Sequence, residues 1–167
     1  MSHELAHWIR ACAGRRVLLI GDLILDRYIY GDADRISPEA PVPVIKVVER
    51  REAVGGSANV AACLRALDCK VVCCGVVGTD RHATTLRRLL SEIQVDSSGL
   101  LEVANRPTTT KTRVVGLAQH RHRQQLMRVD EEDASPLPSP LMDKMIDLCR
   151  ETFGGSMSSV SKTTTRD

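Results

Sequence analysis

The sequence predicts an α/β fold in which helices flank a mainly parallel sheet, with a smaller β-sheet beside it. Between residues 55 and 93, stretches typical of amphipathic helices alternate with an apolar run typical of a buried strand, which favours parallel strands. Two other stretches, about 36–49 and 108–130, break this alternation and carry strand patterns of their own. With 167 residues, the chain is long enough for one such domain with a core.

The N-terminal part predicts a short helix followed by extended chain. A helical spacing of apolar residues begins after Ser2, a favourable N-cap, and ends at Gly14. This apolar face comprises Leu5, Trp8, Ile9 and Cys12. The apolar run Val17–Ile20 predicts a strand buried on both faces, and residues 26–31 predict a second extended segment.

Three prolines, at positions 38, 41 and 43, then predict a loop or an edge strand, because proline cannot donate to a sheet ladder. From position 42 onward, Val42, Val44 and Val48 fall on one side of the chain, which suits a strand of a small separate sheet.

The rest of the chain predicts helices at 55–67, 81–93 and 141–150 and strands at 71–77, 108–118 and 124–129. The apolar stripe expected on the first of these helices consists of Val60, Ala61, Leu64 and Leu67. Residues 1–150 therefore form the predicted domain. Residues 151–167, rich in Ser and Thr, are predicted to be a flexible tail.

Composition excludes several classes of partner. The net charge is +2, and no apolar run reaches membrane-spanning length, so we expect neither a nucleic-acid nor a membrane partner. The six cysteines include no C-x-x-C pair, and most lie in apolar contexts. We therefore expect reduced thiols in a cytoplasmic protein and no metal site.

Two segments could bind the hydroxyl groups of a sugar. Asp22 and Asp26 follow a predicted buried strand, and ligands of open α/β sheets bind beyond the carboxyl ends of strands. Gly55 and Gly56 can approach a ligand closely at a helix N-terminus, and Asn59 lies one turn further on. The alternatives are a turn acid or helix cap for the carboxylates, and an ordinary glycine turn for the pair of glycines.

Cationic residues occur at a third place. Lys111 and Arg113 point to one face of a predicted strand and Arg128 lies on the next, an arrangement that suits a phosphate dianion. A solvated strand face explains the charge pattern equally well. His120 and His122 lack further ligands nearby in sequence, so an exposed loop is expected there instead of a metal site.

Three segments together resemble the ribokinase-like (PfkB) carbohydrate kinases. They are VLLIGDLILDRYIYGDADRISPEAPVPVIKV, GGSANVAACLRALDCKVVCCGVVGTD and TKTRVVGLAQHRHRQQLMRVDEED, which together span about residues 17–133. Within that family, D-R-Y-x-Y-G followed by R-I-S-P-E-A-P-V-P-V resembles the heptose 7-phosphate kinase domain of the bifunctional heptose kinase/ADP-heptose synthases.

The resemblance implies a Rossmann-like α/β/α domain with a small β lid, which in this family often forms a dimer interface. It implies that Asp26, Gly55, Gly56 and Asn59 hold sugar hydroxyls. It further implies that Lys111 and Arg128 help to bind the sugar phosphate or to close the lid. The cofactors it implies, for an intact parent enzyme, are ATP and Mg²⁺.

The sequence departs from this family in one large respect. The G-A-G-D motif, which carries the family's general base, does not occur in these residues, so no catalytic residue is assigned. We expect the N-terminal half of a kinase, with negligible activity alone and an exposed apolar sheet edge. The parent would phosphorylate D-glycero-D-manno-heptose 7-phosphate at its anomeric hydroxyl, in ADP-heptose and lipopolysaccharide core synthesis. The alternatives are a non-catalytic sugar-phosphate-binding or dimerisation module, or a non-functional gene fragment.

Overall fold

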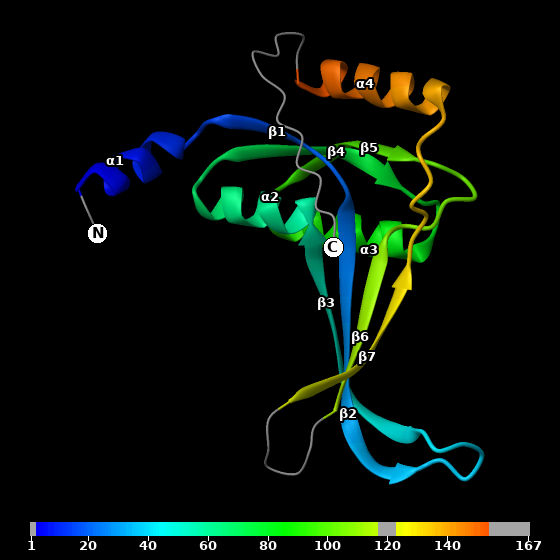
Figure 1. Cartoon of the computed structure of the whole chain (residues 1–167). Helices are drawn as coiled ribbons and strands as arrows, with labels where there is room; N and C mark the ends of the chain where they lie inside the picture. The colour runs from blue at the N-terminus through cyan, green and yellow to red at the C-terminus, as the bar shows by residue number, and fades with distance from the viewer. Residues whose placement is uncertain (1–2, 117–122, 154–167) are drawn as a thin grey trace.

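The computed structural model describes residues 3–116 and 123–153, which fold around two sheets. The first is a three-stranded parallel sheet inside a helical body. The second is a four-stranded mixed sheet that projects from the body, and we call it the projecting sheet (Figure 1). This arrangement confirms the predicted α/β fold with a second sheet. The prediction that the second sheet is the smaller one is wrong, because long strands pair along β2 and the parallel sheet has only three strands in the described residues.

The parallel sheet has the order β1-β4-β5. Its strands are β1 (Arg16–Ile20), β4 (Lys70–Val77) and β5 (Asp96–Glu102). β4 occupies the centre and is buried along nearly its whole length, as a continuous apolar run predicts. β1 lies at the edge of this sheet, and its apolar residues are only half-buried, so the prediction of a strand buried on both faces is wrong for β1. β5 was not predicted, because it begins with the polar residues Asp-Ser-Ser-Gly.

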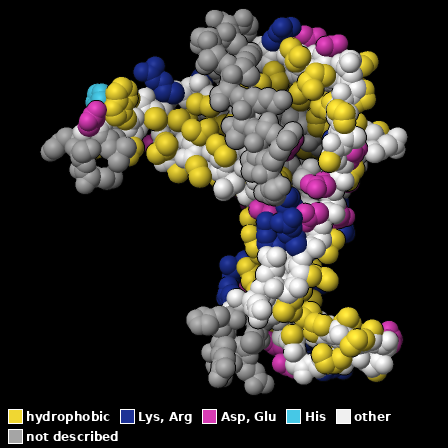
Figure 2. Space-filling model, viewed as in Figure 1, with side chains coloured by type: hydrophobic (Ala, Val, Ile, Leu, Met, Phe, Trp, Pro, Cys, Tyr) yellow, Lys and Arg dark blue, Asp and Glu magenta, His cyan; other side chains and the backbone are white. Residues whose placement is uncertain are grey.

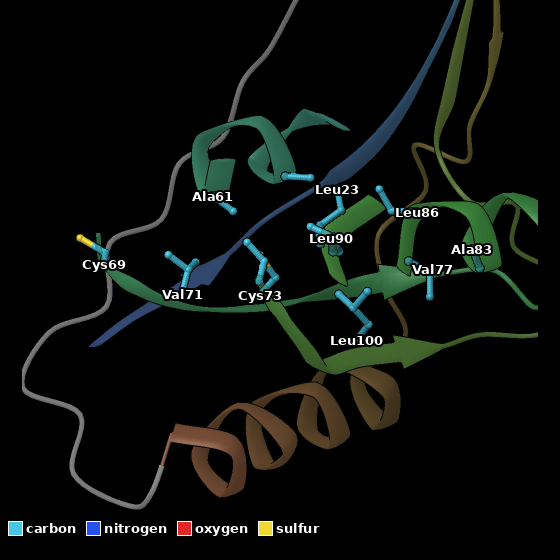
Figure 3. Close-up of a cluster of buried hydrophobic side chains, with 12 residues drawn as sticks. Leu23, Ala61, Cys69, Val71, Cys73, Val77, Ala83, Leu86, Leu90 and Leu100 are labelled. Carbon is cyan, nitrogen blue, oxygen red and sulfur yellow. The ribbon is translucent and has the colours of Figure 1, made fainter. Parts of the chain in front are cut away.

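Helices cover both faces of this sheet (Figure 1). One face carries α2 (Ser57–Ala66) and α3 (Arg81–Glu92), and the other carries α4 (Ser139–Phe153). The core between the sheet and the helices α2 and α3 includes the fully buried Leu86 and Leu90 (Figure 3). Burial of each such leucine contributes roughly 1.5–3 kcal/mol.

Two details of the predicted helices are wrong. The second helix starts at Ser57, because Gly55 and Gly56 end a long strand instead of opening the helix. Its buried residues include Ala58, whereas Val60 is 43% exposed, because only small side chains fit where this helix meets the sheet.

The N-terminal helix α1 (His3–Cys12) forms as predicted, but its apolar face is not fully covered. Trp8 remains 62% exposed and Ile9 38% exposed, because α1 extends away from the body at the start of the chain (Figure 1). The predicted cap, Ser2, lies outside the described residues.

The projecting sheet has the order β3-β2-β6-β7. Its strands are β2 (Leu23–Ile36), β3 (Pro43–Gly56), β6 (Thr110–Gly116) and β7 (Gln124–Glu131). Only two residues separate the end of β1 from the start of β2, so almost continuous chain runs from the body into the projecting sheet (Figure 1). Leu23 and Leu25 anchor this start in the interior, with exposed fractions of 1% and 0%.

Candidate functional site

A cavity of about 920 Å³ opens where the parallel sheet meets the projecting sheet. It lies at the carboxyl end of β1, and its polar wall includes Asp22, Asp26, Lys111 and Arg113. These residues come from segments that are far apart in sequence. The fold therefore brings two separately predicted groups, the carboxylates and the strand cations, to one place at the carboxyl end of a parallel strand.

The end of β3 shapes one side of this cavity through its two glycines. A Cβ on Gly55 would lie 2.5 Å from Asp26 Oδ2, so only a glycine lets the carboxylate rest against this strand. Gly56 has a φ of 54°, and a Cβ there would lie 2.6 Å from the Asp22 carbonyl oxygen. That oxygen instead accepts a hydrogen bond from the Ser57 backbone N–H at 2.9 Å. The glycines therefore bring the N-terminus of α2 next to Asp22 and Asp26.

Asp26 has a cationic partner within the site. Arg113 Nη1 donates to Asp26 Oδ1 at 2.5 Å, and the two side chains are 23% and 19% exposed. The guanidinium also lies over the Tyr28 ring, 5.4 Å from its centroid. The hydrogen bond to Asp26 raises the pKa of Arg113, so the guanidinium stays protonated throughout the physiological range.

The cations Lys111 and Arg128 share a different carboxylate. Lys111 Nζ lies 3.9 Å from Asp130 Oδ2, and Arg128 Nε lies 3.0 Å from Asp130 Oδ1. β6 and β7 pair so that Arg113 faces Arg128 and Lys111 faces Asp130. All four side chains therefore share one face of the projecting sheet.

The predicted site residues divide into two groups. Asp26, Gly56 and Lys111 line the cavity, and Gly55 touches the Asp26 carboxylate. Asn59 lies on the exposed side of the first turn of α2 and is not among the lining residues. Arg128 is also outside the lining, with a side chain that is 42% exposed. The structure thus brings four of the six predicted residues together.

Sequence reasoning missed two parts of the cavity wall. Arg106 lines it and donates through Nη2 to the carbonyl oxygens of Asp133 and Ser135. The helix α4 adds an apolar side formed by Met142, Met145 and Ile146. Arg106 follows β5, which was itself not predicted, so its position next to β6 left no recognisable pattern in the sequence.

The G-T-D segment after β4 is structural in this chain. Asp80 Oδ1 caps α3 by accepting from the Ala83 N–H at 2.9 Å. Its Oδ2 accepts from the Thr108 N–H at 2.8 Å, and the Thr108 hydroxyl accepts from the Gly78 N–H at 2.9 Å. Asp80 therefore links the body to the residues that lead into β6, and it does not line the cavity.

The described residues contain no group of three or more His, Cys, Asp or Glu side chains placed to hold a metal ion. His120 and His122 fall outside these residues. No helix in the described part of the chain is long and apolar enough to cross a membrane.

Comparison with known proteins identifies what this chain is similar to. Residues 15–150 match the model of the pfkB family carbohydrate kinases. The chain is 49% identical over 121 residues to the bifunctional protein HldE of Methylobacillus flagellatus, covering 72% of this chain and 24% of that protein. Against HldE of Helicobacter pylori strain HPAG1 it is 44% identical over 137 residues, covering 82% and 28%. The chain thus spans about a quarter of the length of these curated relatives.

Solved structures share the fold at low identity. Arabidopsis thaliana ribokinase, complexed with ribose and ATP, superposes with a TM-score of 0.55 at 20% identity, covering 81% of this chain and 43% of that one. A carbohydrate kinase from Agrobacterium tumefaciens superposes with a TM-score of 0.54 at 18% identity, covering 70% and 35%. In both, the described fold corresponds to less than half of the solved chain.

Proposed function

We propose that this chain, which belongs to the pfkB family of carbohydrate kinases, is the substrate-binding part of a heptose 7-phosphate kinase. The parent enzyme would transfer a phosphoryl group from ATP to the anomeric hydroxyl of D-glycero-D-manno-heptose 7-phosphate. Its place would be in ADP-heptose synthesis for the lipopolysaccharide core, in the cytoplasm. The identity to two HldE proteins supports the heptose class of substrate.

One observation carries the proposal: the Asp26 carboxylate rests against Gly55 inside a cavity that also receives Lys111 and Arg113. A carboxylate accepts hydrogen bonds from sugar hydroxyls, and converging cations suit a phosphate. A sugar phosphate offers both groups in one molecule, and a cavity of about 920 Å³ is large enough to enclose it.

The implied cofactors fit these residues poorly. Kinases of this family generally use ATP with Mg²⁺, but the described residues include no cluster of carboxylates placed for a metal ion. The residues that bind the sugar therefore do not by themselves supply the Mg²⁺ site. We assign no step of phosphoryl transfer to them. Their proposed work is to bind the sugar phosphate and to orient it.

Calorimetric titration of the purified chain with D-glycero-D-manno-heptose 7-phosphate tests this proposal. We expect saturable binding, and no phosphorylated product when ATP and Mg²⁺ are added. Gly55→Ala should abolish binding, because its Cβ would overlap the Asp26 carboxylate. Gly116→Ala is the matched control on the same sheet, because its Cβ would meet only the flexible Leu126 side chain, at 3.1 Å.

Three results would contradict the proposal. The first is a wild-type chain that does not bind the sugar phosphate, and the second is equal binding by wild type and Gly55→Ala with circular dichroism showing both folded. The third is rapid turnover of ATP, which would contradict a purely substrate-binding role. Translation of the coding DNA beyond Arg150 in all three frames separates the parent kinase from a non-catalytic module, since only the kinase requires a G-A-G-D segment.

We also propose that the chain forms a homodimer through the projecting sheet. Of the twelve large hydrophobic residues exposed in the described chain, seven belong to this sheet or to its β2–β3 loop. They are Ile36, Val42, Val47, Val48, Leu126, Met127 and Val129. Figure 2 shows hydrophobic side chains gathered at the far end of the sheet. Exposed apolar side chains gathered in this way are typical of protein interfaces.

Sedimentation analysis tests the dimer. The wild-type chain should sediment as a dimer, and the double variant Met127→Glu, Val129→Glu should sediment as a monomer, because charges would enter the apolar interface. Val60→Glu is the control: this valine is also exposed, at 43%, but it belongs to α2 and not to a strand of the projecting sheet. A wild-type monomer at every concentration would overturn this proposal.

A further inference from the structure

The pairing of Arg113 with Asp26 places a cation on the carboxylate that a sugar would need. Arg113 lies opposite Tyr28 in the β2–β6 register, and Lys111 lies opposite Asp26. Arg113 therefore reaches back along the sheet by two residues to meet Asp26, and its Nη1 also lies 3.5 Å from the Lys111 carbonyl oxygen. The face of its guanidinium rests over Tyr28, 5.4 Å from the ring centroid. The side chain is thus held from three sides.

The two oxygens of Asp26 are in different surroundings. Oδ2 faces the backbone of Gly55, where even a Cβ would approach to 2.5 Å, and Oδ1 accepts from Arg113. A neutral sugar that donated to Oδ1 would compete with the guanidinium for this oxygen, and displacing the guanidinium would leave a partly buried cation without its partner. Such a loss is costly, because an ionised group taken from its partner is not compensated by a neutral hydroxyl.

A phosphorylated sugar changes this balance. Its phosphate can accept two parallel hydrogen bonds from a guanidinium, which is the geometry that arginine prefers. Arg113 would then exchange one anion for another, and Asp26 Oδ1 would become available for a sugar hydroxyl. Both residues line the cavity, so a single ligand can reach them together.

We propose that Arg113 is the residue by which this site selects phosphorylated sugars over neutral ones. In the free protein, Arg113 occupies the Asp26 carboxylate and so competes with sugar hydroxyls. An anionic group on the ligand binds Arg113 in its place and leaves the carboxylate free for a sugar hydroxyl; we call this arrangement the lock. This inference rests on the proposed function of the site. It assigns to one side chain both the attraction of the phosphate and the exclusion of neutral sugars.

The chain offers a closely matched control arginine. Arg51 lies on the same sheet, pairs with Glu49 and lies over the neighbouring Tyr30, 5.8 Å from its ring centroid. It therefore repeats the local surroundings of Arg113, an acid and a tyrosine, but it does not line the cavity. Substituting either arginine removes one positive charge from the projecting sheet, so the two variants lose the same formal charge.

The test compares the Kd values of the full chain for heptose 7-phosphate and for the unphosphorylated heptose. We expect the wild type to bind the phosphate ester at least about 100-fold more tightly, a ratio typical of lost charge-assisted hydrogen bonds. In Arg113→Gln the ester should bind at least about 10-fold more weakly and the neutral heptose more tightly, since Asp26 is released. Arg51→Gln should keep the wild-type ratio.

Each outcome decides between the proposals. Wild type that binds neither sugar overturns the proposed function and this inference with it. If the wild type binds both sugars and Arg113→Gln weakens the binding of both equally, the inference alone is overturned.

The variant Arg113→Lys guards against misfolding, because it keeps the positive charge at this position. We expect Arg113→Lys to bind the phosphate ester about 10-fold more weakly, because an ammonium group cannot donate the two parallel hydrogen bonds of a guanidinium. The neutral heptose should still bind weakly. A tighter neutral complex in Arg113→Lys would contradict the lock.

Discussion

Asp80 links α3 of the body to the residues that lead into the projecting sheet. It accepts hydrogen bonds from Ala83 in α3 and from both the N–H and the hydroxyl of Thr108. Burial alone would raise the pKa of Asp80, but the hydrogen bonds from Thr108 and Ala83 outweigh it, and the pKa lies below its usual value. The ionised carboxylate is therefore part of the folded structure.

Asp80→Asn should destabilise the chain by roughly 1–3 kcal/mol, because the amide nitrogen cannot accept the Thr108 N–H. Urea unfolding at pH 7 measures this difference. Since the folded pKa is lowered, the stabilisation by Asp80 is fully present above the unfolded value of about 3.9. It is lost as the pH falls through the folded value, so wild type and variant should converge in acid.

Asp147→Asn is the control for this comparison, because Asp147 is 67% exposed and pairs only with Arg150 within the same helix. It should change stability by less than about 0.5 kcal/mol. An Asp80→Asn chain as stable as Asp147→Asn at neutral pH would show that the link between Asp80 and Thr108 contributes nothing.

The cysteines should differ sharply in reactivity. Cys63 is exposed, whereas burial raises the pKa of Cys73 to about 12 and also raises the pKa of Cys74. Iodoacetamide at pH 8 should therefore label Cys73 and Cys74 at least about 100-fold more slowly than Cys63, because the thiolate is the nucleophile. Peptide mass spectrometry over time measures this ratio, and equal rates in the native chain would contradict the buried placement.

At the scale of single residues, sequence identified some site residues and not others. Asp26 could be proposed because it comes after an apolar strand run, and Lys111 because strand alternation fixes its face. Arg113 was recognised as a cation, but its pairing with Asp26 depends on β2 and β6 lying side by side, which joins residues 87 apart in sequence. No local pattern carries that information.

At the scale of elements, two glycines opposite one another in the projecting sheet have different roles. Gly31 of β2 pairs in register with Gly116 of β6. A Cβ on Gly31 would lie 2.5 Å from the Lys46 carbonyl oxygen, which is backbone and cannot easily move. On Gly116 the nearest atom, at 3.1 Å, belongs to the flexible Leu126 side chain.

Gly31→Ala should therefore destabilise the chain by roughly 1–3 kcal/mol through overpacking of the β2–β3 pair. Gly116→Ala should lie within about 1 kcal/mol of wild type, because the lost freedom of the unfolded chain offsets a small steric cost. Thermal unfolding of the two variants checks this, and a Gly116→Ala chain less stable than Gly31→Ala would reverse the argument.

Elements with a strong apolar period were predictable, and elements defined by tertiary contact were not. α3 and β4 were found at nearly their observed bounds, since helix and buried-strand patterns are strong there. β5 was missed because its first half is polar, and β3 was predicted too short because its charged middle resembles a loop. Pairing with β4 and β2 makes them strands.

At the scale of the whole molecule, the body and the projecting sheet share one interior through Leu23 and Leu25. They should therefore unfold together. The only two tyrosines, Tyr28 and Tyr30, lie in the projecting sheet and report on it alone once Trp8 is replaced by phenylalanine. Tyrosine fluorescence and far-ultraviolet circular dichroism should give coincident thermal transitions. An earlier tyrosine transition would mean that the projecting sheet unfolds independently.

The overall α/β arrangement followed from alternating strands and helices, but the relation between the two sheets did not. Sequence placed a small sheet beside a larger one and could not show that β2 continues almost directly from β1. That continuity puts Asp22 and Asp26 at the joint and so determines where the cavity forms.

The long separation between β2 and β6 also has a consequence for the newly made chain. Asp26 and its partner Arg113 are 87 residues apart, so a ribosome adding 5–20 residues per second completes the second roughly 4–17 s after the first. The β2–β3 hairpin can pair locally in that interval, with one edge of β2 still open. During translation, the carboxylate half of the site is thus made before its cationic half exists.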